Sequence, residues 1–159
     1  VDFPLFEYNE ELGKWDPAHH LFSMPQEQHL DSLETDPGSV MGQLYDLVCN
    51  GVELASGSIR VHDPQLQQRI FSVVGIGPEE AQQRFGFLLD AFRYGPPPHG
   101  GIAPGLDRLV MLLAGEESIR EVIAFPKNTL GMSLMDDCPA EVEPKQLEEL
   151  HIRVIAPDA

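Results

Sequence analysis

The dipeptide Asn50-Gly51 limits the fold more narrowly than any other feature of the sequence. It lies between two runs of strand-forming residues, in the segment LYDLVCNGVELASGSIRVHD over residues 44–63. Asn-Gly is the preferred pair for a two-residue hairpin turn, because both residues tolerate positive φ angles. The segment therefore predicts an antiparallel hairpin, and the fold must contain an antiparallel sheet.

A two-residue turn also fixes which side chains share a face of the hairpin. It places Val48 opposite Glu53 and Asp46 opposite Ala55, so that Asp46 and Glu53 become diagonal neighbours on one face, roughly 7–8 Å apart or somewhat less. Two carboxylates at that separation can hold a hard cation such as Mg²⁺ together with the phosphate oxygens of a ligand. The alternative is a solvated face with two ordinary surface acids.

Arg60 is a third candidate on the same hairpin. Strict alternation from Glu53 puts Arg60 on the opposite face, but the small residues of Ala55–Gly57 are typical of a bulge or a close backbone approach. One extra residue near Ser56–Gly57 would turn Arg60 into the same cavity as Glu53. A guanidinium there suits bidentate capture of a small carboxylate.

The rest of the chain mixes strand and helix signals. The segment FPLFEYNEELGKW predicts a strand, a turn and a second strand, and residues 18–40 form a long connection of the kind that often forms a lid. Helices are predicted from Pro64 and from Pro78, followed by a strand at GGIAPG and a helix from Leu106 to Ala114 that ends at Gly115. A short strand is predicted at 119–127, and a last helix and strand at 144–154. This mixture predicts an α+β fold, with an antiparallel sheet flanked by helices.

The stretch PPPHGGIAPGLDRLVMLLAGEE over residues 96–117 raises a second possible anion site. Its apolar stripe is predicted to face the core: Leu106, Leu109, Val110 and Leu113. The N-terminus of a helix attracts anions, and Arg108 adds a charge and a planar group that can stack on a base, with Asp107 beside it to orient it. The alternative is a purely structural Asp-Arg pair at a helix start.

Composition excludes several classes of protein. A length of 159 residues predicts one domain over residues 1–159, and a net charge of -16 argues against nucleic-acid binding by this chain itself. Cys49 and Cys138 have no paired spacing, which favours a reducing, cytoplasmic setting. No apolar run is long enough to predict a membrane span, and no signal peptide is expected. Val1 at the start leads us to expect an excised piece of a longer protein.

Taken together, five segments resemble one family. FPLFEY, HHLFSMP, YDLVCNGVELASGSIRVHD, FGFLLDAFRYGPPPHGGIAPGLDRLVMLLAG and IREVIAFPKN are similar to the C-terminal part of the catalytic domain of bacterial-type aspartyl-tRNA synthetases, which are class II enzymes. The resemblance runs from Phe3 to Val154, and GLDR matches the third class II signature motif. It implies a partial class II catalytic domain.

The resemblance also implies an activity and a set of roles. The parent would be an ATP-dependent ligase in which L-aspartate attacks the α-phosphate of ATP, and the aspartyl group then passes to tRNA. By matching position, His19 and Arg60 would bind aspartate, and Asp46 and Glu53 would hold Mg²⁺ on the ATP phosphates. The residues that would bind ATP are Glu53, Gly105, Leu106, Asp107 and Arg108. Arg60 and Arg108 would be the catalytic residues.

The family's anticodon-binding barrel, dimer-forming first motif and second motif are not matched, so we expect tRNA contacts and homodimerisation to lie elsewhere in a parent protein. We expect this chain alone to be inactive and to self-associate through exposed edge strands. The sequence departs from the family at Leu21, Ala55, Ser56 and Pro104. Two alternatives stay open: a non-catalytic paralogue that binds an amino acid or nucleotide, and an ATP-dependent ligase of the asparagine or ammonia type. Whether the parent would charge only the aspartate tRNA or the asparagine tRNA as well is also open.

Overall fold

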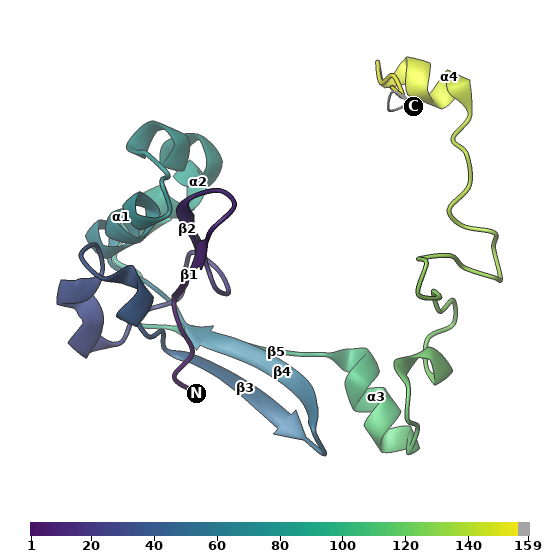
Figure 1. Cartoon of the computed structure of the whole chain (residues 1–159), viewed down its shortest axis with the longest axis horizontal. Coiled ribbons are helices and arrows are strands. Elements are labelled where there is room, and N and C mark those ends of the chain that lie inside the picture. The colour runs from purple at the N-terminus through teal and green to yellow at the C-terminus, as the bar shows by residue number, and fades with distance from the viewer. Residues whose placement is uncertain (156–159) are drawn as a thin grey trace. The chain divides into compact units, whose positions relative to one another are not determined.

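The computed structural model describes residues 1–155, and the chain divides into two compact units, Val1–Leu106 and Asp107–Ala159. Figure 1 shows the order of the elements along both units. The two units are described separately below, and the expectation of a single domain stays a prediction.

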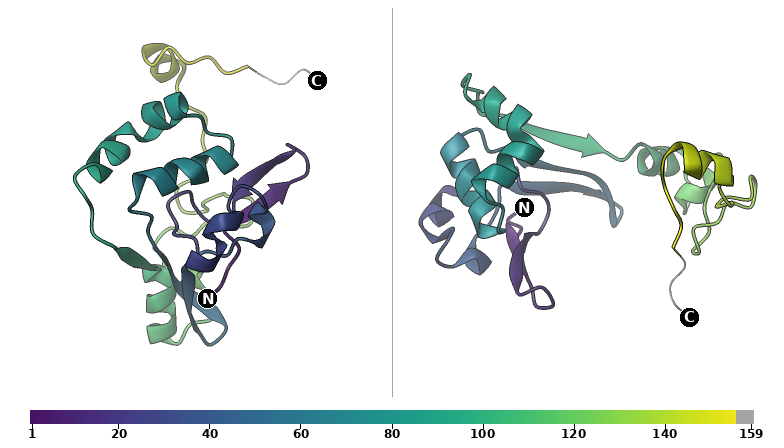
Figure 2. Two further views of the ribbon diagram at one scale, coloured as in Figure 1. Left: turned by 90° about the vertical axis from the view of Figure 1, so that its left-hand side faces the viewer. Right: turned by 90° about the horizontal axis from the view of Figure 1, so that it is seen from above.

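The first unit contains two antiparallel sheets and two α-helices (Figures 1 and 2). Its elements are β1 (Phe6–Asn9), β2 (Lys14–Pro17), the 3-10 helices η1 (Glu27–Ser32) and η2 (Pro37–Ser39), β3 (Leu44–Cys49), β4 (Val52–Ile59), α1 (Pro64–Val73), α2 (Pro78–Phe92) and β5 (Gly100–Pro104). Strands β1 and β2 form a hairpin, and β3, β4 and β5 form a three-stranded sheet in that order. The predicted α+β class and both hairpins are confirmed.

Both helices begin as their sequences predict. The Asp63 side chain caps α1 by accepting hydrogen bonds from the backbone N–H groups of Gln65 at 2.7 Å and Leu66 at 3.1 Å. Pro64 and Pro78 occupy the first helical turns, where a missing N–H costs no hydrogen bond. Gly95, with a φ of 72°, follows the end of α2.

The core of the first unit is built mainly by residues of β1, of the long connection after β2, and of α1 and α2. Phe71 is fully buried and stacks on Phe85 with ring centroids 5.3 Å apart. Phe22, from the long connection between β2 and β3, packs edge-on against Phe85 at 5.4 Å and against Phe71 at 6.3 Å. This connection is therefore held by aromatic packing to α1 and α2.

The register of β3 against β4 confirms part of the prediction and corrects part of it. Asn50 and Gly51 have φ angles of 51° and 77°, and Val48 pairs with Glu53 as expected. Asp46, however, pairs with Ser56 rather than Ala55, because the register shifts between Leu47 and Val48. The extra residue is Leu54, so the bulge is three residues nearer the turn than Gly57.

Gly57 has a different role, namely a close approach between strands. A Cβ on Gly57 would collide with the carbonyl oxygen of Gly101 on β5 and with the Tyr45 ring on β3. The Tyr45 hydroxyl donates a hydrogen bond of 2.9 Å to that same Gly101 oxygen. The predicted close backbone approach is therefore confirmed here, while the ladder itself runs without a break from Ala55 to Ser58 against β3 and from Ala55 to Ile59 against β5.

The second unit contains α3, which begins at Leu106 at the end of the first unit (Leu106–Ala114), a 3-10 turn η3 (Ile119–Glu121) and α4 (Pro144–Glu149). The predicted helix bounds for α3 and its Gly115 terminator, with a φ of 74°, are confirmed. The predicted strand at 119–127 is wrong, since Ser118 caps η3 there instead and only Lys127 forms an isolated bridge, to Ser133. Residues 152–154 form no strand either.

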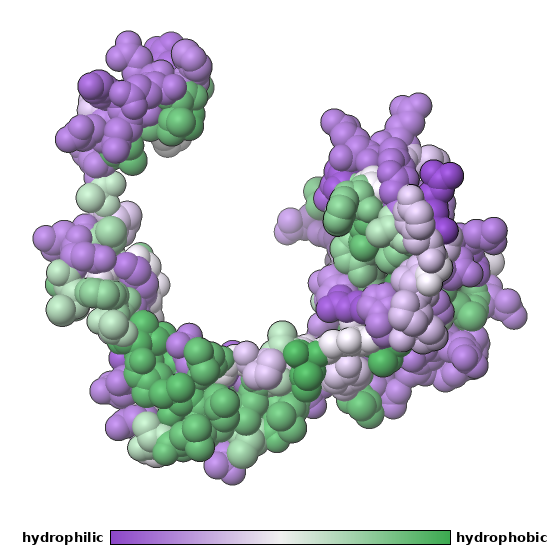
Figure 3. All heavy atoms as spheres, turned by 180° about the vertical axis from the view of Figure 1, so that it is seen from behind, coloured by the Kyte–Doolittle hydropathy of each residue, from purple (hydrophilic) through white to green (hydrophobic). Residues whose placement is uncertain are grey.

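The apolar stripe of α3 is exposed, contrary to the prediction that it faces the core. Leu113 is 80% exposed and Leu106 is 70% exposed, whereas Met111, on the other side of the helix, is buried. Figure 3 shows hydrophobic atoms gathered over this helix. Leu109 and Val110, at 39% and 40% exposed, are partly covered, so the described residues cover the middle of the stripe more than its ends. Periodicity shows which face of the helix is apolar but not how far that face is covered. No helix among residues 1–155 is both long enough and apolar enough to cross a membrane.

Candidate functional site

One face of the three-stranded sheet carries the predicted carboxylates and Arg60. The register places Asp46 beside Ser56, and alternation then puts Ser58 and Arg60 on the same face. The bulge at Leu54 returns Glu53 to this face as well, next to Val48. Asp46 and Glu53 are thus diagonal neighbours. The expected consequence of a bulge holds, although its position differs from the predicted one.

Burial changes along this face. Glu53 is exposed, Asp46 and Ser56 are half-buried, and Ser58 is fully buried. Arg60 follows the end of β4 and is half-buried. The face therefore runs from a wet, acidic end near the turn to a dry, polar end that carries one cation.

The two carboxylates fit a magnesium site that is completed by a ligand. Among residues 1–155 no group of three or more His, Cys, Asp or Glu residues could hold a metal ion. Mg²⁺ commonly takes only one or two protein carboxylates and completes its octahedron with waters and substrate phosphates. Asp46 and Glu53 supply such a pair, on two rigid strands joined by a short turn.

Arg60 is fixed by the segment that carries the paired histidines. The backbone of Ser23 forms an antiparallel bridge with Arg60. The Val61 N–H donates to the Phe22 carbonyl and the Met24 N–H donates to the Ile59 carbonyl, both at 2.9 Å. On the other side, the Arg60 N–H donates to the carbonyl of His99 at 2.9 Å. The segment around Phe22 thus continues the sheet beside the end of β4.

This pairing brings His20 against the Arg60 side chain, a contact that sequence reasoning missed. The Nη1 atom of Arg60 contacts both ring nitrogens of His20 and lies 3.0 Å from Nδ1. The Ser58 hydroxyl lies 3.3 Å from Nε2 of His20, and the Ser23 hydroxyl lies 3.4 Å from the same atom. Burial, reinforced by the positive charge of Arg60 and by His19, lowers the pKa of His20. The imidazole is therefore neutral at neutral pH.

His19 lies in different surroundings. It is exposed, and its ring packs edge-on against Phe3 with centroids 5.6 Å apart. Neighbouring residues in an extended segment point in opposite directions, so only one of the two histidines can face Arg60. The role of His19 toward aspartate stays a prediction. Alternation of side chains shows that only one of the two histidine rings can face Arg60, but it does not show which one.

The candidate ATP residues lie on both sides of the division between the units. The Gly105 N–H donates a 2.7 Å hydrogen bond to the carbonyl of Leu54, so the bulge on β4 anchors the chain just before α3. Leu106 is exposed at the start of α3. Asp107 and Arg108 are exposed residues in its first turn. That Arg108 acts together with Arg60 stays a prediction.

Two of the positions that depart from the family pattern face each other. Ala55 on β4 pairs with Pro104 on β5, on the face opposite Asp46 and Ser56. The N–H of Gly105 points toward β4, and successive N–H groups of a strand point in opposite directions. The nitrogen of Pro104 therefore points away from β4, so its lack of a hydrogen costs no hydrogen bond between β4 and β5. The Ala55 side chain therefore does not narrow the carboxylate face.

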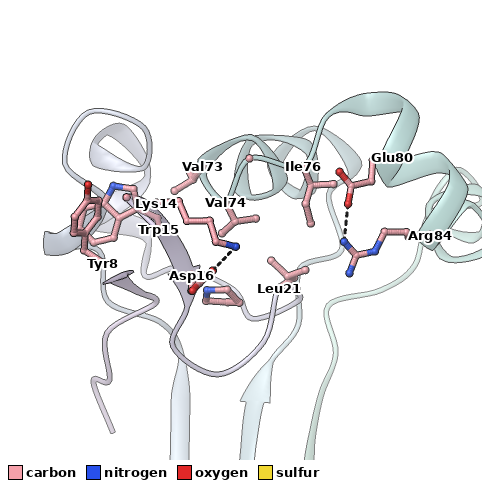
Figure 4. Close-up of a pocket in the computed structure, with 13 residues that line it drawn as sticks. Tyr8, Lys14, Trp15, Asp16, Leu21, Val73, Val74, Ile76, Glu80 and Arg84 are labelled. Atoms are coloured by element: carbon pink, nitrogen blue, oxygen red, sulfur yellow. Dashed lines mark hydrogen bonds and ion pairs between the residues drawn. The ribbon is translucent and has the colours of Figure 1, made fainter. Parts of the chain in front are cut away.

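A separate cleft of about 740 Å³ lies between the β1–β2 hairpin and the start of α2. Figure 4 shows Trp15, Leu21 and Ile76 among its lining side chains, with ion pairs on two of its walls. Lys14 pairs with Asp16 at 3.0 Å, and Arg84 pairs with Glu80 at 2.7 Å. Because each of these cations is already paired with its own carboxylate, this cleft is a poor site for a nucleotide. It contains none of the sequence-predicted site residues.

Comparisons with known proteins agree with this picture. A family model described as tRNA synthetases class II (D, K and N) matches residues 1–129. The aspartate–tRNA(Asp/Asn) ligase of Treponema pallidum is 69% identical over 154 residues, which is 97% of this chain and 26% of that protein. The aspartate–tRNA(Asp/Asn) ligase of Rubrobacter xylanophilus is 64% identical, covering 99% of this chain and 26% of that protein.

Solved structures agree as well. The aspartyl-tRNA synthetase of Entamoeba histolytica superposes with a TM-score of 0.56 and 28% identity, covering 71% of this chain and 21% of that one. The chain spans about a quarter of the length of the curated relatives it matches. From the family match over residues 1–129 and the identity to these relatives, the chain belongs to the class II tRNA synthetase family of the D, K and N type.

Proposed function

We propose that this chain is the C-terminal part of the catalytic domain of an aspartate–tRNA ligase, and that it supplies the aspartate-binding and ATP-binding residues described above. The observation that carries the proposal is the shared face of Asp46, Glu53 and Arg60, which places a cation and a carboxylate pair on one rigid sheet. Both curated relatives named above are described as aspartate–tRNA(Asp/Asn) ligases.

In this proposal the dry and wet ends of the face have different partners. Arg60, at the dry end, binds the side-chain carboxylate of aspartate through two parallel hydrogen bonds, with His19 contacting the same substrate. Asp46 and Glu53, at the wet end, hold Mg²⁺, which neutralises the charge of the ATP phosphates. The separation of Arg60 from the two carboxylates along this face sets the spacing between the amino acid and the phosphates, so that the reaction is promoted by alignment and electrostatics.

The start of α3 completes the ATP site. Gly105, without a side chain, lets the ligand approach the backbone, and Leu106 adds an apolar wall. Arg108 stacks on the adenine and neutralises the terminal phosphate, with Asp107 orienting it. Arg60 and Arg108 are the two residues to which we assign a catalytic role.

The remaining partners act through other parts of the protein. The net charge of -16 repels a polyanion, so tRNA binds mainly through segments outside these residues. We propose a homodimeric parent that works in the cytoplasm, where tRNA is charged.

The test is ATP–pyrophosphate exchange by the full-length protein that carries this chain, with aspartate or asparagine as the amino acid. Arg60→Ala removes charge-assisted hydrogen bonds worth about 1.5–3 kcal/mol, so kcat/KM for aspartate falls by roughly tenfold to 150-fold. Arg84→Ala, an exposed arginine of α2 paired with Glu80, is the matched control and leaves exchange unchanged.

Other outcomes decide against the proposal. Unchanged exchange in Arg60→Ala at subsaturating aspartate would refute its role. Nucleotide binding without exchange would identify a non-catalytic paralogue, and exchange that prefers asparagine would identify the related ligase.

A further inference from the structure

The contact between His20 and Arg60 has no role in the function proposed above. The ring is held from two sides: its segment pairs with residues 59–61, and Phe22 anchors that segment in the aromatic core. Ser23 and Ser58, whose hydroxyls lie next to the ring, are fully buried. His20 is therefore a fixed, half-buried group that lies beside two buried hydroxyls.

The ring of His20 can accept a hydrogen bond from Arg60. The backbone N–H of Phe22, which can only donate, lies 3.2 Å from Nδ1. The Nη1 group of Arg60 also can only donate, and it contacts both ring nitrogens. A neutral imidazole always has one unprotonated nitrogen, so it can accept from Arg60 in either tautomer, while the hydroxyls of Ser58 and Ser23 can donate or accept at Nε2.

We propose that His20 is a positioning residue: its neutral ring accepts a hydrogen bond from Arg60 and fixes the guanidinium so that the other donors of Arg60 face the substrate carboxylate. This inference rests on the proposed function, because it presupposes that Arg60 binds aspartate. It concerns the neighbour of His19, the histidine to which the sequence assigned substrate contact.

The chemistry of the acceptor explains why a histidine suits this position. A carboxylate in place of His20 would form an ion pair with Arg60 and compete with the substrate for its charge. A neutral acceptor restricts the side chain while leaving its full charge for the ligand. That charge is what distinguishes aspartate from asparagine, whose side-chain amide is neutral.

Protonation of His20 would reverse this arrangement. The charged and titratable groups that influence its ring are Arg60, in direct contact, and His19, the preceding residue in the chain. A second proton on the ring removes the acceptor and places a second positive charge against the guanidinium. The aspartate KM should then rise as the pH falls through the titration of His20.

The experiment compares His20→Ala and His20→Gln with the wild type in the full-length protein, by aspartate-dependent ATP–pyrophosphate exchange over a range of pH. Loss of one hydrogen bond should raise the aspartate KM of His20→Ala by roughly 2- to 15-fold, with kcat at saturating aspartate little changed. His20→Gln, whose side-chain oxygen can accept from Arg60, should recover most of the affinity, and its KM should not rise on acidification. His29→Gln, on η1, is the matched control and should behave as the wild type.

Each outcome separates the inference from the proposed function. Absence of aspartate-dependent exchange in the wild type refutes the function itself. An active wild type with an unchanged KM in His20→Ala refutes only the positioning role. Equal losses of kcat in His20→Ala and His20→Gln, without rescue and without a change in the pH profile, would show a merely structural residue and also overturn the inference.

Discussion

The two units of this chain differ in where their apolar side chains go. In the first unit, helices α1 and α2 bury Ile70, Phe71 and Ala81 in a core that β1 and the connection between β2 and β3 complete. In the second unit, α3 has a regular apolar stripe, and Leu113 at its end is 80% exposed. The comparison teaches that helical periodicity reports which face is apolar, and that burial depends on whether the rest of the chain supplies a partner.

The largest effect that tests this comparison is expected in the core of the first unit. Phe71→Ala removes a ring that is fully buried against Phe22 and Phe85, and should lower the free energy of unfolding by about 3–5 kcal/mol. Leu113→Ala, on the exposed stripe, should change it little. Urea unfolding of the two variants measures the difference. Similar losses for both would show that the stripe is covered in solution.

A smaller effect is expected from a charge on the stripe. We expect the 159-residue chain to self-associate through its exposed apolar surface, and Leu113→Glu to weaken that association by roughly tenfold or more, since burying a leucine contributes about 1.5–3 kcal/mol. Light scattering over a concentration series measures the association. The control is Val1→Glu, an exposed apolar residue of the first unit. A monodisperse monomer in the unsubstituted chain would contradict the prediction.

The smallest effect concerns a helix start. Asp63→Ala removes two hydrogen bonds to the first turn of α1 and should lower the free energy of unfolding by about 1 kcal/mol. Asp63→Asn, which keeps an acceptor oxygen, should recover most of the loss. Thermal unfolding monitored by circular dichroism distinguishes them. An Asn variant as unstable as the Ala variant would point to charge rather than capping.

Local signals in the sequence predicted the elements well. The Asn50-Gly51 turn, the starts of α1 and α2 at proline, and the bounds of α3 all depend on residues within a few positions of each other. The predicted strand at 119–127 is wrong because a strand needs a partner, and the described part of the chain offers that segment one isolated bridge, from Lys127.

The candidate site was less predictable because its geometry comes from contacts between distant segments. Small residues at Ser56–Gly57 indicated a bulge, but Gly57 is required by the approach of Gly101 and Tyr45, and the extra residue is Leu54. Arg60 nevertheless lies on the carboxylate face. Side chains of a strand alternate between faces, so one extra residue anywhere between Glu53 and Arg60 brings both side chains to the same face. His20 rather than His19 contacts the Arg60 side chain because residues 22–24 pair with residues 59–61. These two segments are distant in the sequence, so no local pattern encodes their pairing.

Pro104 has a consequence for what can add to the sheet. On β5, which is exposed along its whole length, the outward N–H groups belong to Gly100 and Ile102, and the next outward position is the proline. A neighbouring strand could accept N–H hydrogen bonds from the first two positions only, and at Pro104 it would meet a carbonyl acceptor but no donor. Proline thus weakens edge-to-edge stacking of this chain at the position just before Gly105, the first of the proposed ATP-binding residues of this segment.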